Sequence, residues 1–335
     1  MFKKKIIYYL FFTAAVIVCL VFLFIEINKR SAATNPVNYA KQNIIPVKPA
    51  NNINSKIATV PSNNQAAAIP GQPIDPLPAN KPVLTTFSLP IPYINESPDG
   101  SWQGPWKNAC EEASIFMIEK YYLGQQEADI RVAMAFMNNL FTIENKIFGS
   151  NANTDAKQTT QLINDYFSYN ALMKINPTVL DIKKELQQKR PVIAPVFGFD
   201  LHNKNIPFLA PPRGTAYHML VIGGYDDTTK EFITEDSGDI VAGVNHRYTY
   251  DIVMGALHDY NYATNRVDGP ATAIFTYPKL VKLADSPKVY YLHDNIKQWV
   301  TDENIFKAKG WKWEAVNVVE KEWLDTFTIG KDITI

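Results

Sequence analysis

The order of its structural patterns predicts an α+β domain, with helices in the first half of the folded region and mainly strands in the second half. The helical patterns cover residues 129–141, 154–167 and 180–190, and the extended runs cover residues 191–198, 216–225 and 271–278. Roughly 250 residues follow the N-terminal segments, enough for one sizeable core or for one domain with a small appendage.

The N-terminal thirty residues have the pattern of a membrane anchor. Three lysines at residues 3–5 precede an uncharged, apolar run at residues 6–25. A helix of this length can cross the hydrocarbon core of a bilayer. The excess of lysines before the run predicts a cytoplasmic N-terminus, so everything after Arg30 is expected outside a single-pass cell membrane anchor. The alternative is a signal peptide cleaved near residues 31–33, although its apolar region would normally be shorter.

A disordered linker is predicted next, at residues 31–85. This stretch contains nine prolines, nine asparagines and one glycine, without an apolar period that could form a core. Its mean reach is about 40 Å, which would hold a folded domain away from the membrane. The expected organisation is an anchor at 1–30, this linker, a domain at 86–282 and a small module at 283–335.

The composition excludes several classes of function. The chain has 33 basic and 33 acidic residues, and this balance argues against nucleic-acid binding. The sequence shows no glycine-rich phosphate loop, no Cys/His cluster of the metal-binding type and no long repeat array. No cofactor or metal is therefore expected, and any chemistry must come from a few scattered side chains.

Cys110 is the candidate nucleophile, since it is the only cysteine outside the apolar N-terminal run. Asn108 and Glu111 have the spacing of a capping box, which would place Cys110 in the first turn of a helix. The helix dipole and unpaired backbone N–H groups there favour a thiolate. Glu111 and Glu112 would oppose this, although adjacent helical residues do not share a face. The alternative is a small buried core cysteine.

His218 is the candidate base, because a thiol nucleophile needs one and the chain has five histidines. The surrounding sequence predicts a β-hairpin, with a strand to Tyr225, a turn through residues 226–230 and a second strand from Glu231. In a tight hairpin, Asp236 lies close enough to hold the imidazole of His218. Taken alone, a histidine at the start of a strand could equally be structural.

The oxyanion that forms when a thiolate attacks a carbonyl group would need hydrogen-bond donors. The backbone N–H of Cys110 is one candidate. The side-chain amide of Gln103, seven residues earlier, is a second candidate, unless it faces solvent in a loop.

At this point the residues carry a family resemblance. The segments IPYINESPDGSW, CEEAS, PVIAPVFG, YHMLVIGGYDD and FITEDSG resemble papain-like cysteine peptidase domains of the bacteriocin-leader (double-glycine) peptidase-like branch, over residues 86–280. The resemblance implies a papain-like α+β fold, in which a helix start carries the nucleophile and an antiparallel sheet carries the base. It also implies that Cys110, His218 and Asp236 are nucleophile, base and orienting acid.

Two residues depart from the pattern of this family. Members of the family commonly have a glycine directly after the cysteine, whereas this chain has Glu111. Some exported bacterial relatives with a CEEAS signature share this glutamate. Glu96 stands where the family's oxyanion glutamine is expected. A glutamate donates a hydrogen bond only when it is protonated, so either Gln103 substitutes or the oxyanion hole is weakened.

The segment after Lys282 resembles a short module often appended to exported bacterial proteins. Four of its residues, Trp299, Trp311, Trp313 and Trp323, would form either the core of the module or a binding face for the cell wall.

These observations predict a membrane-tethered, extracytoplasmic cysteine hydrolase, a peptidase that cleaves peptide or amide bonds of a peptide or protein substrate through a thioester. One alternative is a catalytically weak or inactive module of the same fold that binds peptides or cell wall, which Glu96 would favour. A second is an acyl or peptidyl transferase, which forms the same thioester and passes it to an amine.

Overall fold

The computed structural model describes residues 84–206 and 216–334 of the 335-residue chain. The expected anchor at residues 6–25 and nearly all of the expected linker lie outside these residues. Among the helices in the two described stretches, none combines the length and the apolar character needed to cross a membrane.

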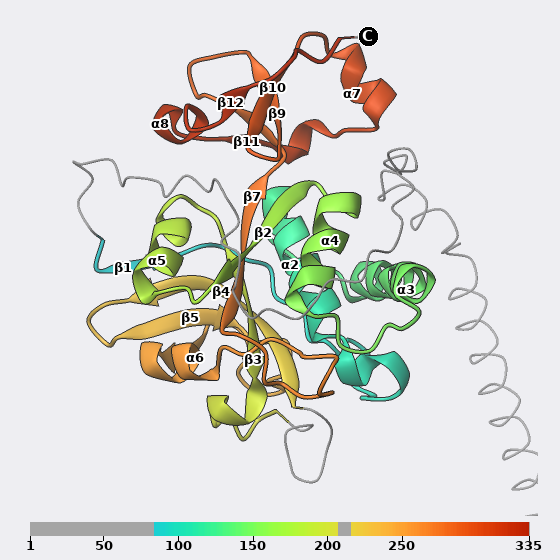
Figure 1. Cartoon of the computed structure of the whole chain (residues 1–335), viewed down its shortest axis with the longest axis vertical. Helices are drawn as coiled ribbons and strands as arrows, with labels where there is room; N and C mark the ends of the chain where they lie inside the picture. The colour runs from blue at the N-terminus through green and yellow to red at the C-terminus, as the bar shows by residue number, and fades with distance from the viewer. Residues whose placement is uncertain (1–83, 207–215, 335) are drawn as a thin grey trace, which may run out of the picture. The chain divides into compact units, whose positions relative to one another are not determined.

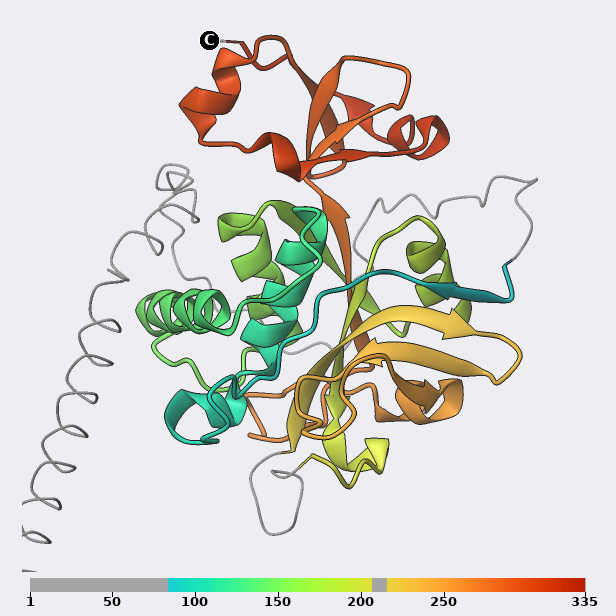
Figure 2. The ribbon, with the colours of Figure 1, turned by 180° about the vertical axis from the view of Figure 1, so that it is seen from behind.

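Helices dominate the first half of the described domain, as the sequence predicts. They are α2 (Cys110–Tyr122), α3 (Ile130–Ile147), α4 (Ala156–Tyr166) and α5 (Val179–Gln187). The carboxylates of Asp129 and Asp155 cap α3 and α4 by accepting backbone N–H groups of their first turns. Figures 1 and 2 show α2, α3 and α4 gathered together beside the sheet, apart from α5.

A seven-stranded antiparallel sheet forms the second layer. Its order is β2-β7-β3-β4-β5-β6, with β1 paired to β4 as well. The strands are β1 (Thr86–Ser88), β2 (Tyr169–Ile175), β3 (Val192–Phe197), β4 (Tyr217–Asp226), β5 (Glu231–Glu235), β6 (His246–Thr249) and β7 (Thr272–Pro278). The predicted hairpin is confirmed as β4 and β5, and a short helix α6 (Tyr250–Ala256) follows β6.

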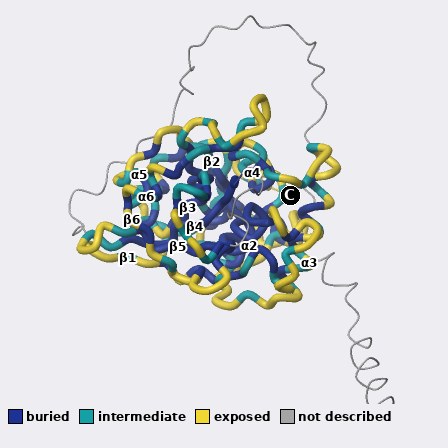
Figure 3. The backbone as a smooth tube through the Cα atoms, turned by 90° about the horizontal axis from the view of Figure 1, so that it is seen from below, coloured by how far each residue is buried: buried dark blue, intermediate teal, exposed yellow. Residues whose placement is uncertain are grey.

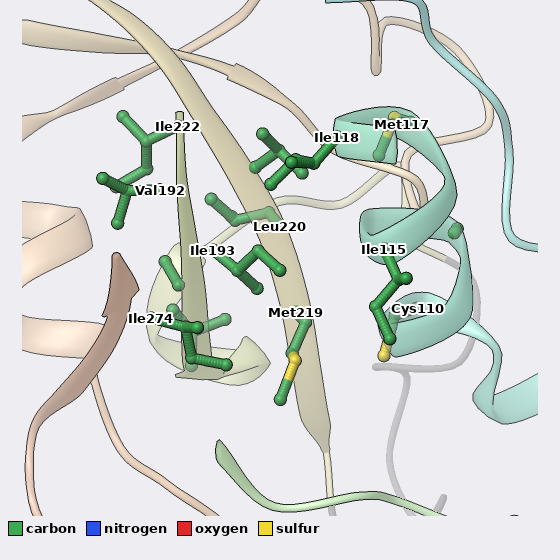
Figure 4. Close-up of a cluster of buried hydrophobic side chains, with 14 of the residues drawn as sticks. Cys110, Ile115, Met117, Ile118, Val192, Ile193, Met219, Leu220, Ile222 and Ile274 are labelled. Atoms are coloured by element: carbon green, nitrogen blue, oxygen red, sulfur yellow. The ribbon is translucent and has the colours of Figure 1, made fainter. Parts of the chain in front are cut away.

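The main core lies between α2 and the central strands. Figure 3 shows buried backbone running through α2, β3, β4 and β5, with the exposed positions around them. In Figure 4, Ile115 and Ile118 of α2 lie beside Met219 and Leu220 of β4, and Cys110 occupies the first turn of the same helix. Burial of this apolar face therefore fixes the cysteine-bearing end of α2 against the strand that carries His218.

The predicted capping box before α2 is wrong. Asn108 ends the preceding 3-10 helix η2 (Gly104–Asn108), and Ala109 is the N-cap of α2, without a side-chain cap. Because the helix begins one residue later than the capping box requires, Glu111 is its second residue. Cys110 nevertheless lies in the first turn, as expected.

A second, five-stranded sheet follows the main sheet, in the order β11-β8-β9-β10-β12. Its strands are β8 (Leu280–Lys282), β9 (Val289–His293), β10 (Ile296–Val300), β11 (Val316–Val318) and β12 (Thr328–Ile329), with helices α7 (Asn304–Lys309) and α8 (Lys321–Leu324). Trp311 and Trp323 pack against two small buried clusters. Trp313 stacks on Phe306 and is about half exposed.

Candidate active site

Cys110 lies where the first turn of α2 meets β4. Its side chain is 2% exposed, so the thiol is almost wholly enclosed by protein. The Sγ–H group donates to Oε2 of Glu111 over 3.1 Å. The expectation that Glu111 would point away from the thiol is therefore wrong, because burial folds its carboxyl back beside the preceding residue.

His218 is the second residue of β4 and is fully buried. Its position is fixed from one side by β3, where Val196 pairs with it. The ring nitrogen Nε2 lies 2.8 Å from Oδ1 of Asp236 and donates to this carboxylate. The other nitrogen, Nδ1, lies 3.7 Å from Oε2 of Glu96.

Asp236 follows directly after β5 and is held by more than the imidazole. Its Oδ2 accepts a 2.6 Å hydrogen bond from the hydroxyl of Tyr248, and Oδ1 accepts one from the backbone N–H of Gly238. Burial alone would raise the pKa of Asp236, but the charge of His218 and these hydrogen bonds lower it below its usual range. The carboxylate can therefore orient the ring of His218.

Glu96 lies close to both Cys110 and His218. The ligand atoms of Glu96, Cys110 and His218 all lie within 4.8 Å of one another. Gln103, by contrast, is exposed before η2, and the hydrogen bonds described for it involve its backbone. Of the five residues singled out from the sequence, the structure thus brings together Cys110, His218, Asp236 and Glu96, and it leaves Gln103 at the surface.

A comparison with protein families identifies the family of this chain. Residues 88–267, more than half of the chain, match the profile of the "Peptidase_C39 like family". The chain belongs to the Peptidase_C39-like family. A crystal structure of a Bacillus anthracis protein described as a C39-like peptidase matches with 14% identity and a TM-score of 0.36, covering 57% of this chain and 97% of that one. The comparison with curated proteins finds no match.

Electrostatics around the thiol differ from the sequence-based expectation for this C39-like chain. Burial, followed by the nearby carboxyl groups of Glu111 and Glu96, raises the pKa of Cys110 well above its ordinary value. These effects outweigh the contribution of the helix N-terminus. The enclosed cysteine is therefore held as a neutral thiol, and it would need a base before it could act as a nucleophile.

The surroundings of His218 favour the charged form of its side chain, whereas those of Cys110 favour the neutral form. Burial alone would lower the pKa of His218, but the adjacent carboxylate of Asp236 raises it, with smaller contributions from Glu96 and Glu111. A histidine in this setting accepts a proton readily, because the carboxylate stabilises the imidazolium. The pair has the properties of a general base and its orienting acid.

Glu96 is mainly protonated at neutral pH. Burial raises its pKa to about 8, against the lowering effect of His218 and with further raising by Glu111 and Asp236. A protonated carboxyl group can donate a hydrogen bond, as the amide of a glutamine would. At the position where the family resemblance predicts a glutamine, Glu96 therefore offers a hydrogen-bond donor below about pH 8.

Sequence reasoning missed the residues that support Asp236. The hydroxyl of Tyr248 reaches the carboxylate, and the hydroxyl of Tyr93 donates to the backbone carbonyls of Asp236 and Asp239. A tyrosine in a short strand gives no local sign of a distant polar partner. Its hydroxyl is identified only once β6 has paired with β5.

Proposed function

We propose that this chain is a cysteine peptidase that cleaves peptide or amide bonds, with Cys110 as nucleophile, His218 as general base and Asp236 as the acid that orients the base. Membership of the Peptidase_C39-like family supports this proposal. The single observation that carries it is the cluster of Cys110, His218 and Glu96 ligand atoms within 4.8 Å, next to the 2.8 Å bond from His218 to Asp236.

The reaction follows from these positions. When substrate binds, Nδ1 of His218 takes the proton of Cys110 and Sγ attacks the carbonyl carbon, which moves the carbonyl π electrons onto oxygen. The backbone N–H of Cys110 and the protonated carboxyl of Glu96 donate to this oxyanion. The imidazolium then protonates the departing amine. Water hydrolyses the remaining thioester.

Alkylation and turnover measurements test the base. Iodoacetamide should label Cys110 in the wild type, and His218→Ala should slow both labelling and hydrolysis of a peptide library. His293→Ala, which removes a histidine of the second sheet, should leave both rates unchanged. The proposal fails if His218→Ala behaves like His293→Ala.

A peptide-binding module is the second candidate, because burial and two nearby carboxyls keep the thiol protonated at rest. In that case Cys110→Ala would retain the biological activity of the chain. Loss of that activity in a folded Cys110→Ala protein would exclude the binding-only function.

We also propose that residues 6–25 anchor the chain, with the catalytic domain outside the cytoplasmic membrane. The three preceding lysines support this orientation. Contact with the cell wall through the second sheet belongs to the same proposal, supported by the exposed ring of Trp313. Protease added to intact spheroplasts should digest most of the chain, and full protection would contradict the orientation.

A further inference from the structure

The candidate active site contains three kinds of side chain that commonly bind one metal ion. A carboxylate oxygen of Glu96, the sulfur of Cys110 and a ring nitrogen of His218 lie within 4.8 Å of one another. All three side chains are buried. Thiolate, imidazole and carboxylate are the ligands that Zn²⁺ takes in proteins, and three protein ligands leave a fourth position for water or substrate.

The imidazole is already oriented as a metal ligand would be. Its Nε2–H donates to Asp236, which places Nδ1 on the side of Glu96. Metal-binding histidines usually donate their second nitrogen to a carboxylate in this way, and the carboxylate fixes the tautomer. Tyr248 and Gly238 hold that carboxylate in turn. The supporting contacts of a metal site are therefore present.

Glu96 provides an independent indication. Its Oε1 is buried and has no hydrogen-bond partner among the described residues, while its Oε2 accepts only a long, 3.4 Å bond from Ser237. A buried carboxylate oxygen without a partner is costly unless a cation or a donor meets it. The family resemblance predicts a glutamine here, and its amide cannot lose a proton to become a charged ligand, whereas the carboxyl group of Glu96 can.

We propose that Glu96, Cys110 and His218 together bind one Zn²⁺ ion, which blocks the nucleophile. On binding, the thiol of Cys110 and the protonated carboxyl group of Glu96 each lose a proton to solvent, and the sulfur and a carboxylate oxygen become bonded to the metal. The carboxylate of Glu111, beside the same sulfur, adds negative charge around the ion. Binding itself rests on the geometry of the three ligands. The inhibitory effect also rests on the proposed function, in which Sγ of Cys110 must be available for attack.

The test uses the full chain in detergent, treated with chelator and titrated with Co²⁺ as a spectroscopic substitute for Zn²⁺. One equivalent of Co²⁺ should produce a thiolate-to-metal charge-transfer band, and Zn²⁺ should abolish it. Cys110→Ser should lack the band. Glu96→Gln should weaken Zn²⁺ binding, measured against a chromophoric chelator, by about 10-fold or more. Glu119→Gln changes a buried carboxyl group of α2 that accepts a hydrogen bond from Ser168. This control variant should bind Zn²⁺ like the wild type.

The outcomes separate the two proposals. A missing band in a folded wild-type protein, or equal Zn²⁺ affinity of Glu96→Gln and wild type, overturns the metal site whether or not the chain cleaves peptides. A one-to-one metal complex without peptidase activity in chelated protein overturns the proposed function and leaves the site standing. Protection of Cys110 from iodoacetamide by Zn²⁺, reduced in Glu96→Gln, reports the blocking directly. Circular dichroism shows that each variant is folded.

Discussion

At the residue scale, the environment of Glu96 matters more than its chemical type. As an exposed carboxylate it would repel an oxyanion, but burial raises its pKa to about 8 and leaves it protonated at neutral pH. A glutamic acid can then perform the task of a glutamine over a limited pH range. The price of this solution is a dependence on pH that an amide does not have.

This dependence gives the first prediction. Wild-type turnover should fall as the pH rises through about 8, because Glu96 loses the proton that it donates, whereas Glu96→Gln should lose no activity there. The loss should approach about 100-fold once the donor is gone. The measurement is kcat between about pH 6 and about pH 10. Iodoacetamide labelling serves as the control, since thiol alkylation should not fall with pH in either protein. Parallel profiles for the two proteins would refute the role of Glu96.

Tyr248 gives a second prediction. Tyr248→Phe removes a hydrogen bond to the charged carboxylate of Asp236 and should destabilise the fold by about 1.5 to 3 kcal/mol. It should also shift the pH profile of kcat/KM, because the carboxylate that faces the imidazole of His218 loses a hydrogen bond that holds it in place and partly neutralises its charge. Tyr250→Phe is the matched control, since its hydroxyl donates to Asp227, away from the site. Equal pH profiles for the two variants would show that Tyr248 is only structural.

How far the site could be predicted differs from residue to residue. The order of Cys110, His218 and Asp236 along the chain, with a hairpin between the last two, was sufficient to group them. The contact between the thiol and Glu111 was not predictable, because it depends on where α2 begins. The sequence offers Asn108 as a cap, yet the chain uses this residue to end η2 instead.

At the element scale, the loop after β5 positions Asp236, the proposed orienting acid. The backbone N–H of Asp236 donates to the carbonyl of Gly243, which closes the loop, and the hydroxyl of Tyr93 bonds to the same loop. A Cβ atom on Gly243 would lie 2.3 Å from the carbonyl oxygen of Asp236 and 2.5 Å from the hydroxyl of Tyr93. Glycine is required here because backbone and hydroxyl approach too closely for any side chain.

The third prediction follows from this contact. Gly243→Ala should displace Asp236 from His218 and lower kcat/KM at least about 10-fold, since a small misplacement in an active site is costly. Gly255→Ala is the matched control, because a Cβ at this position of α6 meets nothing within 4 Å. It should retain activity and gain up to about 1 kcal/mol of stability. Unchanged kcat/KM in Gly243→Ala would exclude the positioning role of the loop.

The elements themselves were largely predictable where a local period exists. The helical patterns at residues 129–141 and 154–167 coincide in large part with α3 and α4, and the hairpin at residues 216–235 is present. The pairing of β1 with β4 was not predictable, because it joins segments more than 130 residues apart. It depends on Gly224, where a Cβ atom would lie 2.5 Å from the carbonyl oxygen of Phe87.

At the scale of the whole molecule, a net charge of zero conceals an acidic interior. Burial raises the pKa of most of the enclosed carboxyl groups, namely Glu96, Glu111, Glu112, Glu119, Glu144, Glu235 and Asp259. The folded chain therefore binds more protons than the unfolded chain between the ordinary pKa of a glutamate and about 8. Proton binding is thus linked to folding in this range.

The sign of the linkage gives the fourth prediction. A group whose pKa is raised by folding contributes stability that is complete below its unfolded pKa and is lost as the pH rises through its folded pKa. The free energy of unfolding should therefore fall from about pH 4.5 to about pH 8. The pKa of Glu144 is raised to about 8 by burial, and Glu144→Gln should remove up to about 1.4 kcal/mol per pH unit of this slope. Urea unfolding at several pH values measures it. An equally steep slope in Glu144→Gln would contradict the assignment.

The enclosed, neutral thiol of Cys110 has a consequence for its reaction with oxidants. Peroxide reacts with thiolates, and the first product is a sulfenic acid. A cysteine that is 2% exposed and keeps its proton at rest offers peroxide little access and little of the reactive thiolate. The same carboxyl groups that keep the thiol protonated therefore also slow its oxidation.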